Sequence, residues 1–122
     1  MPIHRNVLGA QPKGTERVFA QIAGHAQGAR EFVAYENVLL VGAVVPLHTH
    51  TVEELLICLS GQAECSFNGG EPQPYAAGSV VIIPANTPHT IRNTGAAEMR
   101  QLSFFPAPSQ GTVWLEPQGS VE

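Results

Sequence analysis

Two histidines, a glutamate and a third histidine far along the chain have the residue types and spacing of a metal site. His48 and His50 lie two residues apart in a stretch expected to be extended, so both imidazoles leave one face of the chain. Glu54 follows four residues after His50, beyond a connection short enough to bring its carboxylate to the same point. His89 starts another apparent strand. Each residue alone has an ordinary explanation on a surface or in a turn, so the prediction rests on all four.

Three imidazoles and one carboxylate form a mixed set of nitrogen and oxygen ligands. Such a set suits Fe, Mn, Ni, Co or Zn as divalent ions and does not suit a soft ion that prefers thiolates. In a six-coordinate ion it would leave two positions for water or substrate, and metal catalysis requires open positions.

Glu53 competes with Glu54 for the carboxylate position. If the residues up to Leu59 continue as a strand, Glu54 shares a face with Leu56 and Cys58. Glu53 then points outward, as a solvated carboxylate or a partner for an arginine. The alternation therefore favours Glu54.

The elements that must position these residues are short strands. Ten prolines and twelve glycines punctuate the chain, and no window of helical length shows a clean apolar period of about 3.6 residues. Many short strands between Gly, Pro or Asn turns predict an all-β sandwich or barrel. The expected strands cover residues 17–22, 30–34, 37–45, 54–59, 63–67, 80–83, 89–93 and 99–105.

Ser60-Gly61 is a candidate two-residue hairpin between two of these strands. Its register would pair Leu59 with Gln62 and Glu54 with Phe67, and it would set the two cysteines diagonally apart. The cysteines are therefore expected to be buried free thiols. The side chains expected on one face, as the apolar lining of a pocket, are Leu56, Cys58, Ala63, Cys65 and Phe67, joined by Ile91.

Gly and Pro also mark both ends of the chain. The expected single domain has an N-terminal arm at residues 1–16, a barrel at 17–105 and a C-terminal tail at 106–122. Such arms can pack on a neighbouring subunit or remain loose.

Composition narrows the classes of partner. The 122 residues fit one domain, and 43% apolar residues suffice for one core. A net charge of -4 without runs of like charge argues against a nucleic-acid or anionic-membrane surface. The N-terminus lacks the pattern of a signal peptide, and the longest apolar run, residues 38–47, is about half of the ~20 residues of a membrane helix. We expect a soluble cytoplasmic protein.

The spacing of these residues resembles the two motifs of the cupin superfamily. The first motif is matched without a gap or substitution by Gly42, His48, His50, Glu54 and Gly61. The second is matched by Gly78, Pro84, Asn86, His89 and Asn93, with Asn86 where the pattern has glycine. The residues between the motifs, 62–77, resemble the short intermotif segment of small microbial cupins. The resemblance implies a double-stranded β-helix, a jelly-roll barrel, whose metal ligands are His48, His50, Glu54 and His89.

Two departures from the cupin pattern leave the ligands untouched. The pattern's glycine marks an unusual backbone angle, and Asn is among the residues that tolerate a left-handed one at Asn86. Ser79 stands where many cupins have Asp, and a serine side chain can also cap the turn.

The resemblance implies a metal-dependent enzyme acting on a small oxygenated substrate that chelates the ion, either a dioxygenase or a Lewis-acid isomerase or lyase. The alternative is a non-enzymatic cupin that binds a metal or small molecule as a sensor or carrier. Arg100, if it points inward, could bind a substrate carboxylate.

The resemblance also implies a homodimer, with the N-terminal arm and the segment around Trp114 as candidate contacts. Trp114 could equally cap the barrel of its own subunit.

Overall fold

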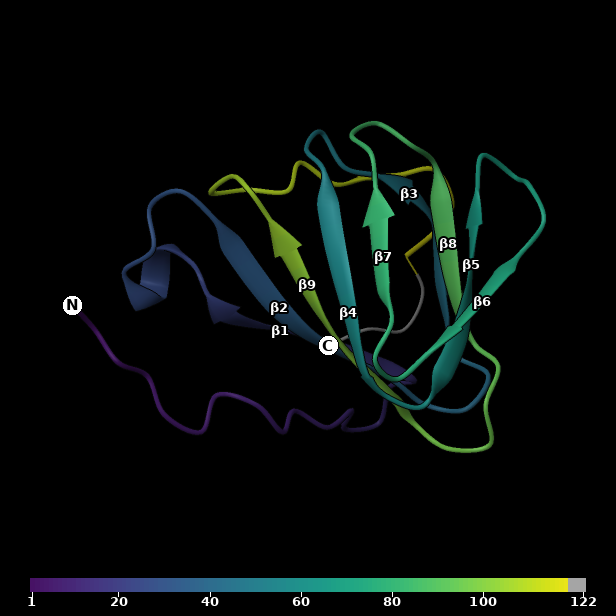
Figure 1. Ribbon diagram of the computed structural model, residues 1–122, viewed down its shortest axis with the longest axis horizontal. Coiled ribbons are helices and arrows are strands. Elements are labelled where there is room, and N and C mark those ends of the chain that lie inside the picture. Colours follow the sequence, from purple (N-terminus) through teal and green to yellow (C-terminus); the bar gives the residue numbers. More distant parts are fainter. Residues whose placement is uncertain (119–122) are drawn as a thin grey trace.

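A computed structural model describes residues 1–118; the last four residues of the expected tail lie outside the described part. Apart from one short 3₁₀ turn, η1 (His25–Gln27), the regular elements are strands (Figure 1). The strands are β1 (Arg17–Ala23), β2 (Val33–Leu39), β3 (Val44–Thr49), β4 (Glu54–Ser60), β5 (Gln62–Phe67), β6 (Gln73–Ala76), β7 (Val80–Ile83), β8 (His89–Asn93), β9 (Met99–Phe105) and β10 (Val113–Trp114). Among the described residues, no helix has the length and apolar character needed to cross a bilayer.

The strands form two antiparallel five-stranded sheets that face each other. The first sheet has the order β1-β2-β9-β4-β7 and the second the order β10-β3-β8-β5-β6. From β3 to β5, and again from β7 to β9, each strand lies in the opposite sheet from the one before it. This alternation is the jelly-roll topology, so the predicted fold class, a double-stranded β-helix, is confirmed.

The core lies between the sheets because side chains alternate along every strand. In β9 the odd-numbered residues are buried and the even-numbered ones are partly exposed. The buried core cluster consists of Leu39, Ala43, Leu56, Cys58, Ala63, Cys65, Ile83, Ile91 and Met99. The shared inward face predicted for Leu56, Cys58, Ala63 and Cys65 is therefore correct.

The predicted hairpin at Ser60-Gly61 is wrong. β4 pairs with β7 and β9, whereas β5 pairs with β6 and β8, so the chain crosses here from one sheet to the other. Glu54 lies opposite Ile83 and not opposite Phe67. Closing a two-sheet barrel requires such a corner. The residues predicted to point inward still do so, because the alternation of buried and exposed side chains continues from β4 into β5.

The two strands predicted at residues 30–34 and 37–45 are also wrong in their boundaries. β2 runs without interruption through Glu36 to Leu39, and the chain turns between β2 and β3, where Gly42 has φ +79°. An unbroken apolar run from Val38 onward hides this turn in the sequence. β6, an edge strand that contains Pro74, and the two-residue β10 were not predicted.

The N-terminal arm, residues 1–16, contains no strand and runs along the outside of the barrel (Figure 1). Its Gly9 and Ala10 amides donate to the carboxylate of Glu36 at 2.8–3.0 Å. Arg100 donates to the same carboxylate at 2.7 Å and to Glu98 at 3.0 Å. Arg100 therefore points outward and holds the arm, and it cannot serve the barrel interior.

Candidate metal centre

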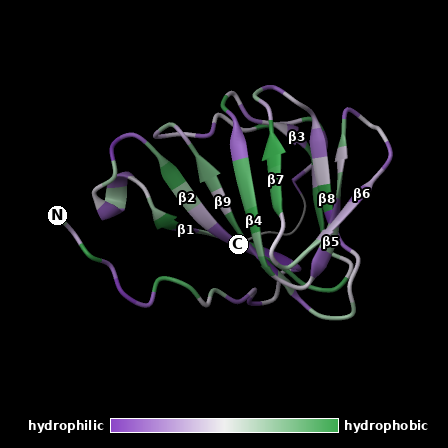
Figure 2. Cartoon of the chain, in the orientation of Figure 1, coloured by the Kyte–Doolittle hydropathy of each residue, from purple (hydrophilic) through white to green (hydrophobic). Residues whose placement is uncertain are grey.

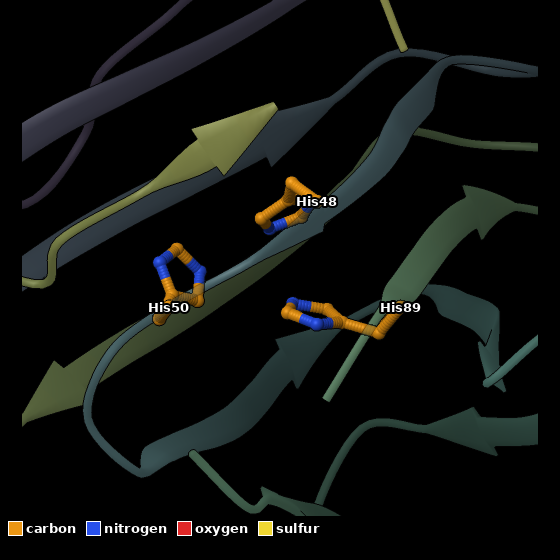
Figure 3. A group of neighbouring side chains, drawn as sticks. All are labelled: His48, His50 and His89. Atoms are coloured by element: carbon orange, nitrogen blue, oxygen red, sulfur yellow. The ribbon is translucent and has the colours of Figure 1, made fainter. Parts of the chain in front are cut away.

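Three histidines converge between the sheets (Figure 3). His48 of β3 lies opposite His89 of β8, and a bulge between Val45 and His48 interrupts the pairing just before them. His50 follows β3 directly. One potential ligand atom from each imidazole lies within 4.8 Å of the others, and the side chains are 4%, 6% and 0% exposed for His48, His50 and His89.

Glu54 enters the same centre from the opposite sheet, as the first residue of β4. Its Oε1 lies 3.4 Å from Nε2 of His50 and 3.4 Å from Nε2 of His89. The side chain is buried, whereas the neighbouring Glu53 is exposed. The centre therefore joins both sheets, and the four residues predicted from the sequence come together in space.

Hydrogen bonds made by Nδ1 fix the orientation of the imidazole rings. Nδ1 of His48 donates to the carbonyl of Pro46 at 2.7 Å, and Nδ1 of His89 donates to the carbonyl of Thr87 at 2.8 Å. Nδ1 of His50 contacts the Thr112 hydroxyl at 3.0 Å. Because a carbonyl accepts only from a protonated nitrogen, Nε2 of His48 and of His89 keeps its lone pair for another partner.

The electrostatics favour a neutral imidazole beside an ionised carboxylate. Burial, reinforced by the charge of His89, lowers the pKa of His48 to about 4. Burial alone would raise the pKa of Glu54, but the neighbouring imidazoles of His50 and His89 outweigh it and lower that pKa to about 2. At neutral pH these are the protonation states that bind a divalent ion.

Two buried atoms of the centre have no hydrogen-bond partner, and a bound cation would be a partner for both. Within residues 1–118, Oε1 of Glu54 and Nε2 of His89 form no hydrogen bond. Leaving such atoms unpaired in a protein interior is unfavourable by about 1–3 kcal/mol each. An N₃O donor set with two unsatisfied donor atoms fits a divalent transition metal, and the three buried histidines could bind one.

A cavity of about 60 Å³ adjoins the histidines. Its apolar wall includes Leu39, Val45, Leu56 and Ile91, and its polar wall includes Asn37, Gln101, Ser103 and Thr112. Of the residues that the sequence predicted to line a pocket, Leu56 and Ile91 line this cavity. Of the others, Cys58, Ala63 and Cys65 belong to the core cluster and Phe67 packs against it.

The two thiols are free and lie within the core. Burial raises the pKa of Cys65 to about 12 and also raises that of Cys58. Neither cysteine belongs to the group of converging ligand atoms. The expectation of buried free thiols is confirmed.

The C-terminal segment, residues 110–118, lines the cavity with Thr112, Trp114 and Gln118. Of the two roles considered for Trp114 from the sequence, the structure has the one in its own barrel, whereas the contribution of Thr112 was not predicted. The Thr51 amide donates to the carbonyl of Gln110 at 3.1 Å, and β10 pairs Trp114 with His48. The rings of these two residues lie 4.7 Å apart. Trp114 thus packs over the barrel of its own chain. The alternating Thr-Val-Trp at residues 112–114 was the available signal.

Arg17 was also missed, because it looked like the polar start of a strand. Its side chain is only 4% exposed and lines the cavity beside His48 and Trp114.

Comparison with known proteins places these features in a family. A family model described as "Cupin domain" matches residues 37–105, a span that includes the whole candidate metal centre. Auxin-binding protein 1 of Arabidopsis thaliana is 30% identical over 89 residues, covering 66% of this chain and 45% of the plant protein. Dimethylsulfoniopropionate lyase DddQ of Ruegeria pomeroyi is 27% identical over 88 residues, covering 72% of this chain and 44% of the lyase. The chain thus spans less than half the length of either relative.

Solved structures share the architecture. An uncharacterized conserved protein with a double-stranded β-helix domain from Klebsiella pneumoniae superposes with a TM-score of 0.76 at 19% identity, covering 87% of this chain and 90% of that one. The structure of DddQ superposes with a TM-score of 0.65 at 27% identity, covering 75% of this chain and 46% of that one. The likeness therefore extends well beyond the two sequence motifs.

Proposed function

The chain belongs to the family of cupin domains, and on that premise we propose that it is a metal-dependent enzyme acting on a small oxygenated substrate that chelates the ion. The supporting observation is the buried centre of His48, His50, Glu54 and His89, with unsatisfied donor atoms beside a cavity. A buried donor set that only stabilised the fold would not need an adjoining cavity.

Each residue has a definite task in this proposal. His48, His50, Glu54 and His89 would hold one Fe, Mn, Ni, Co or Zn ion, which when bound supplies a Lewis acid or a site for O₂. The Pro46 and Thr87 carbonyls fix the rings of His48 and His89. Leu56 and Ile91 exclude water from one side of the cavity, and Asn37 and Ser103 offer polar contacts on another.

Two reaction classes share this proposal, oxygenation and Lewis-acid elimination or isomerisation. Similarity to the Ruegeria lyase supports elimination. Binding without catalysis is the second candidate function, and the similarity to the plant auxin-binding protein supports it.

One experiment separates enzyme from binder. The purified, metal-containing protein is incubated with a panel of hydroxy acids, keto acids, diketones and catechols, while O₂ uptake and product masses are followed. An enzyme converts at least one compound with many turnovers, and His50→Ala abolishes this whereas the exposed His25→Ala does not. Compounds that bind stoichiometrically and emerge unchanged would favour the binding function.

The proposal includes a homodimer in the cytoplasm. The outward residues of β7, Val80 and Ile82, are 58% and 61% exposed, and Ile82 lies beside Leu55 of β4. Figure 2 shows hydrophobic residues along β7 and most of β4, whereas β6 is mostly hydrophilic and hydrophobic and hydrophilic residues alternate in β5. An apolar outer face on one sheet suits a second copy of the chain.

The N-terminal arm carries further exposed apolar residues, Ile3, Val7 and Leu8. It therefore remains the candidate contact of the two expected from the sequence, because the segment around Trp114 packs within its own chain.

A further inference from the structure

A buried cation faces the cavity beside the candidate metal centre. Arg17, the first residue of β1, is 4% exposed. Its guanidinium carbon lies 5.6 Å from the ring centroid of Trp114, and that ring lies 4.7 Å from the ring of His48. Arg17 and His48 therefore both contact Trp114, and all three residues lie on the wall of the same cavity.

Within residues 1–118, Arg17 has one hydrogen-bonded nitrogen and one buried nitrogen without a partner. Its Nη2 donates to the backbone carbonyl of Gln118. Its Nε is buried and forms no hydrogen bond with any described residue, and none of the ion pairs within residues 1–118 involves Arg17. Burial lowers the pKa of Arg17, yet an arginine stays charged at neutral pH.

Arg100, in contrast to Arg17, has the contacts expected of an arginine with a structural role. Its two terminal nitrogens contact Glu36 at 2.7 Å, Glu98 at 3.0 Å and the carbonyl of Ala10 at 3.1 Å. Among residues 1–118 the opposing charge that acts on Arg17 is that of the adjacent, exposed Glu16, which raises the pKa of Arg17 by less than burial lowers it. A buried charge that is only partly compensated is unfavourable, so Arg17 is suited to take an anion from the cavity.

We propose that Arg17 binds the carboxylate of the substrate, which makes the substrate class small carboxylic acids carrying a second oxygen group directed at the histidines. This inference rests on the proposed function and specifies that the substrate is an anion. A planar guanidinium matches a carboxylate in a two-point contact, and it discriminates against the neutral amide of the same shape.

The cavity sets the size and polarity of such a ligand. About 60 Å³ accommodates a short acid and not a long chain. The polar wall of Asn37, Gln101 and Ser103 suits a hydroxyl or keto oxygen, while Leu39 and Val45 suit a short carbon skeleton.

A purely structural Arg17 makes a different prediction. In that case the residue only clamps the C-terminal segment through Gln118 and Trp114. Changing it would lower stability and would leave the preference between an acid and its amide unaltered.

The test compares lactate with lactamide, which share a shape and differ in charge. Trp114 is the single tryptophan of the chain, so its fluorescence reports on this cavity, and calorimetry gives the affinities independently. The metal-containing wild-type protein should bind lactate at least about tenfold more tightly than lactamide. Arg17→Gln should reduce that preference to about twofold or less, and Arg17→Lys should retain an intermediate preference. Arg92→Gln, which changes an exposed arginine, should match wild type.

Metal content, circular dichroism and melting temperature are measured for each variant to detect folding defects. If Arg17→Gln does not fold, Arg17→Lys is compared with wild type in its place. An undiminished preference for lactate in the folded Arg17 variants would overturn the inference, because the metal alone would then select the acid. A wild-type protein that holds metal but does not distinguish lactate from lactamide would also overturn it while leaving the proposed function intact. A protein that takes up no metal would instead remove the proposed function.

Discussion

Each histidine of the candidate centre offers one nitrogen inward because its other nitrogen is already engaged. For His48 and His89 the engaged partner is a carbonyl only two residues earlier in the chain, so the sequence neighbourhood itself aims the ring. For His50 the partner is Thr112, which lies 62 residues away and belongs to the C-terminal segment. The affinity of the centre for metal should therefore depend on a residue that is not itself a ligand.

Thr112→Val removes this hydroxyl and keeps the shape of the side chain. Without a partner for Nδ1, the ring of His50 loses its fixed orientation, and we expect the metal affinity to fall about 10- to 100-fold. Competition with a chromophoric chelator measures it. Thr94→Val, at an exposed position, serves as the control and should leave the affinity unchanged.

The corner between β4 and β5 depends on a glycine. Gly61 has φ +79°, and a Cβ at this position would lie 2.8 Å from the carbonyl oxygen of Glu98 and 2.9 Å from Cα of Met99. The loop that precedes β9 therefore packs directly on the corner, and a side chain at position 61 would collide with it.

Gly61→Ala combines backbone strain with this collision. Gly69, with φ +71° and open space around it, isolates the strain alone. We expect Gly69→Ala to lower the free energy of unfolding by about 1 kcal/mol and Gly61→Ala by at least about 2 kcal/mol. Urea denaturation gives both values, and equal losses would show that the contact with Glu98 does not matter.

The N-terminal arm is tied down by one buried carboxylate. Burial alone would raise the pKa of Glu36, but the amides of Ala10 and Gly9 and the guanidinium of Arg100 lower it below its ordinary 4.5. A carboxyl whose pKa is lowered by folding stabilises the native state at pH values above 4.5, and this contribution is lost as the pH falls through the lowered pKa. Arm docking should therefore be constant at neutral pH and weaken only in acid.

Glu36→Gln should loosen the arm at every pH, because the neutral amide loses the ion pair with Arg100 and offers one acceptor oxygen where the carboxylate offers two. We expect a loss of about 2 kcal/mol in unfolding free energy and faster proteolysis within residues 1–16 at pH 7. Mass spectrometry of limited digests locates the cuts. Glu31→Gln, at an exposed site, should digest like wild type, and equal rates for the two variants would contradict this account of the arm.

The barrel as an assembled unit shows how far sequence reasoning reaches. Alternation is local, so the inward faces of β4 and β5, the bounds of β7, β8 and β9 and the left-handed φ of Asn86, at 59°, could all be predicted. The pairing of strands, in contrast, joins residues that are far apart in the sequence. Leu55 lies beside Phe104 because the barrel must close, and no short-range pattern marks that contact.

The same limit explains the parts of the site that were missed. The four converging ligands could be predicted because two motif spacings fix them. Arg17 and Thr112 reach the site from the two ends of the chain, through a sheet edge and a two-residue strand, and only the closed barrel brings them together.

The apolar outer face of the first sheet leads to a prediction about assembly. Ile82→Glu places a charge at the centre of the proposed contact between copies, and it should convert a dimer into a monomer in size-exclusion chromatography with light scattering. Ser66→Glu, on the outer face of the second sheet, should remain dimeric. A monomeric wild-type protein would refute the dimer.

Elemental analysis of purified protein tests the metal centre itself. Wild type and Glu53→Gln should each hold about one divalent transition metal ion per chain, because the exposed Glu53 takes no part. Glu54→Gln, folded by circular dichroism, should retain less than about a tenth of that ion, since it loses the carboxylate that reaches both His50 and His89. Metal retained by Glu54→Gln and lost by Glu53→Gln, or no metal in wild type after reconstitution, would contradict the centre described here.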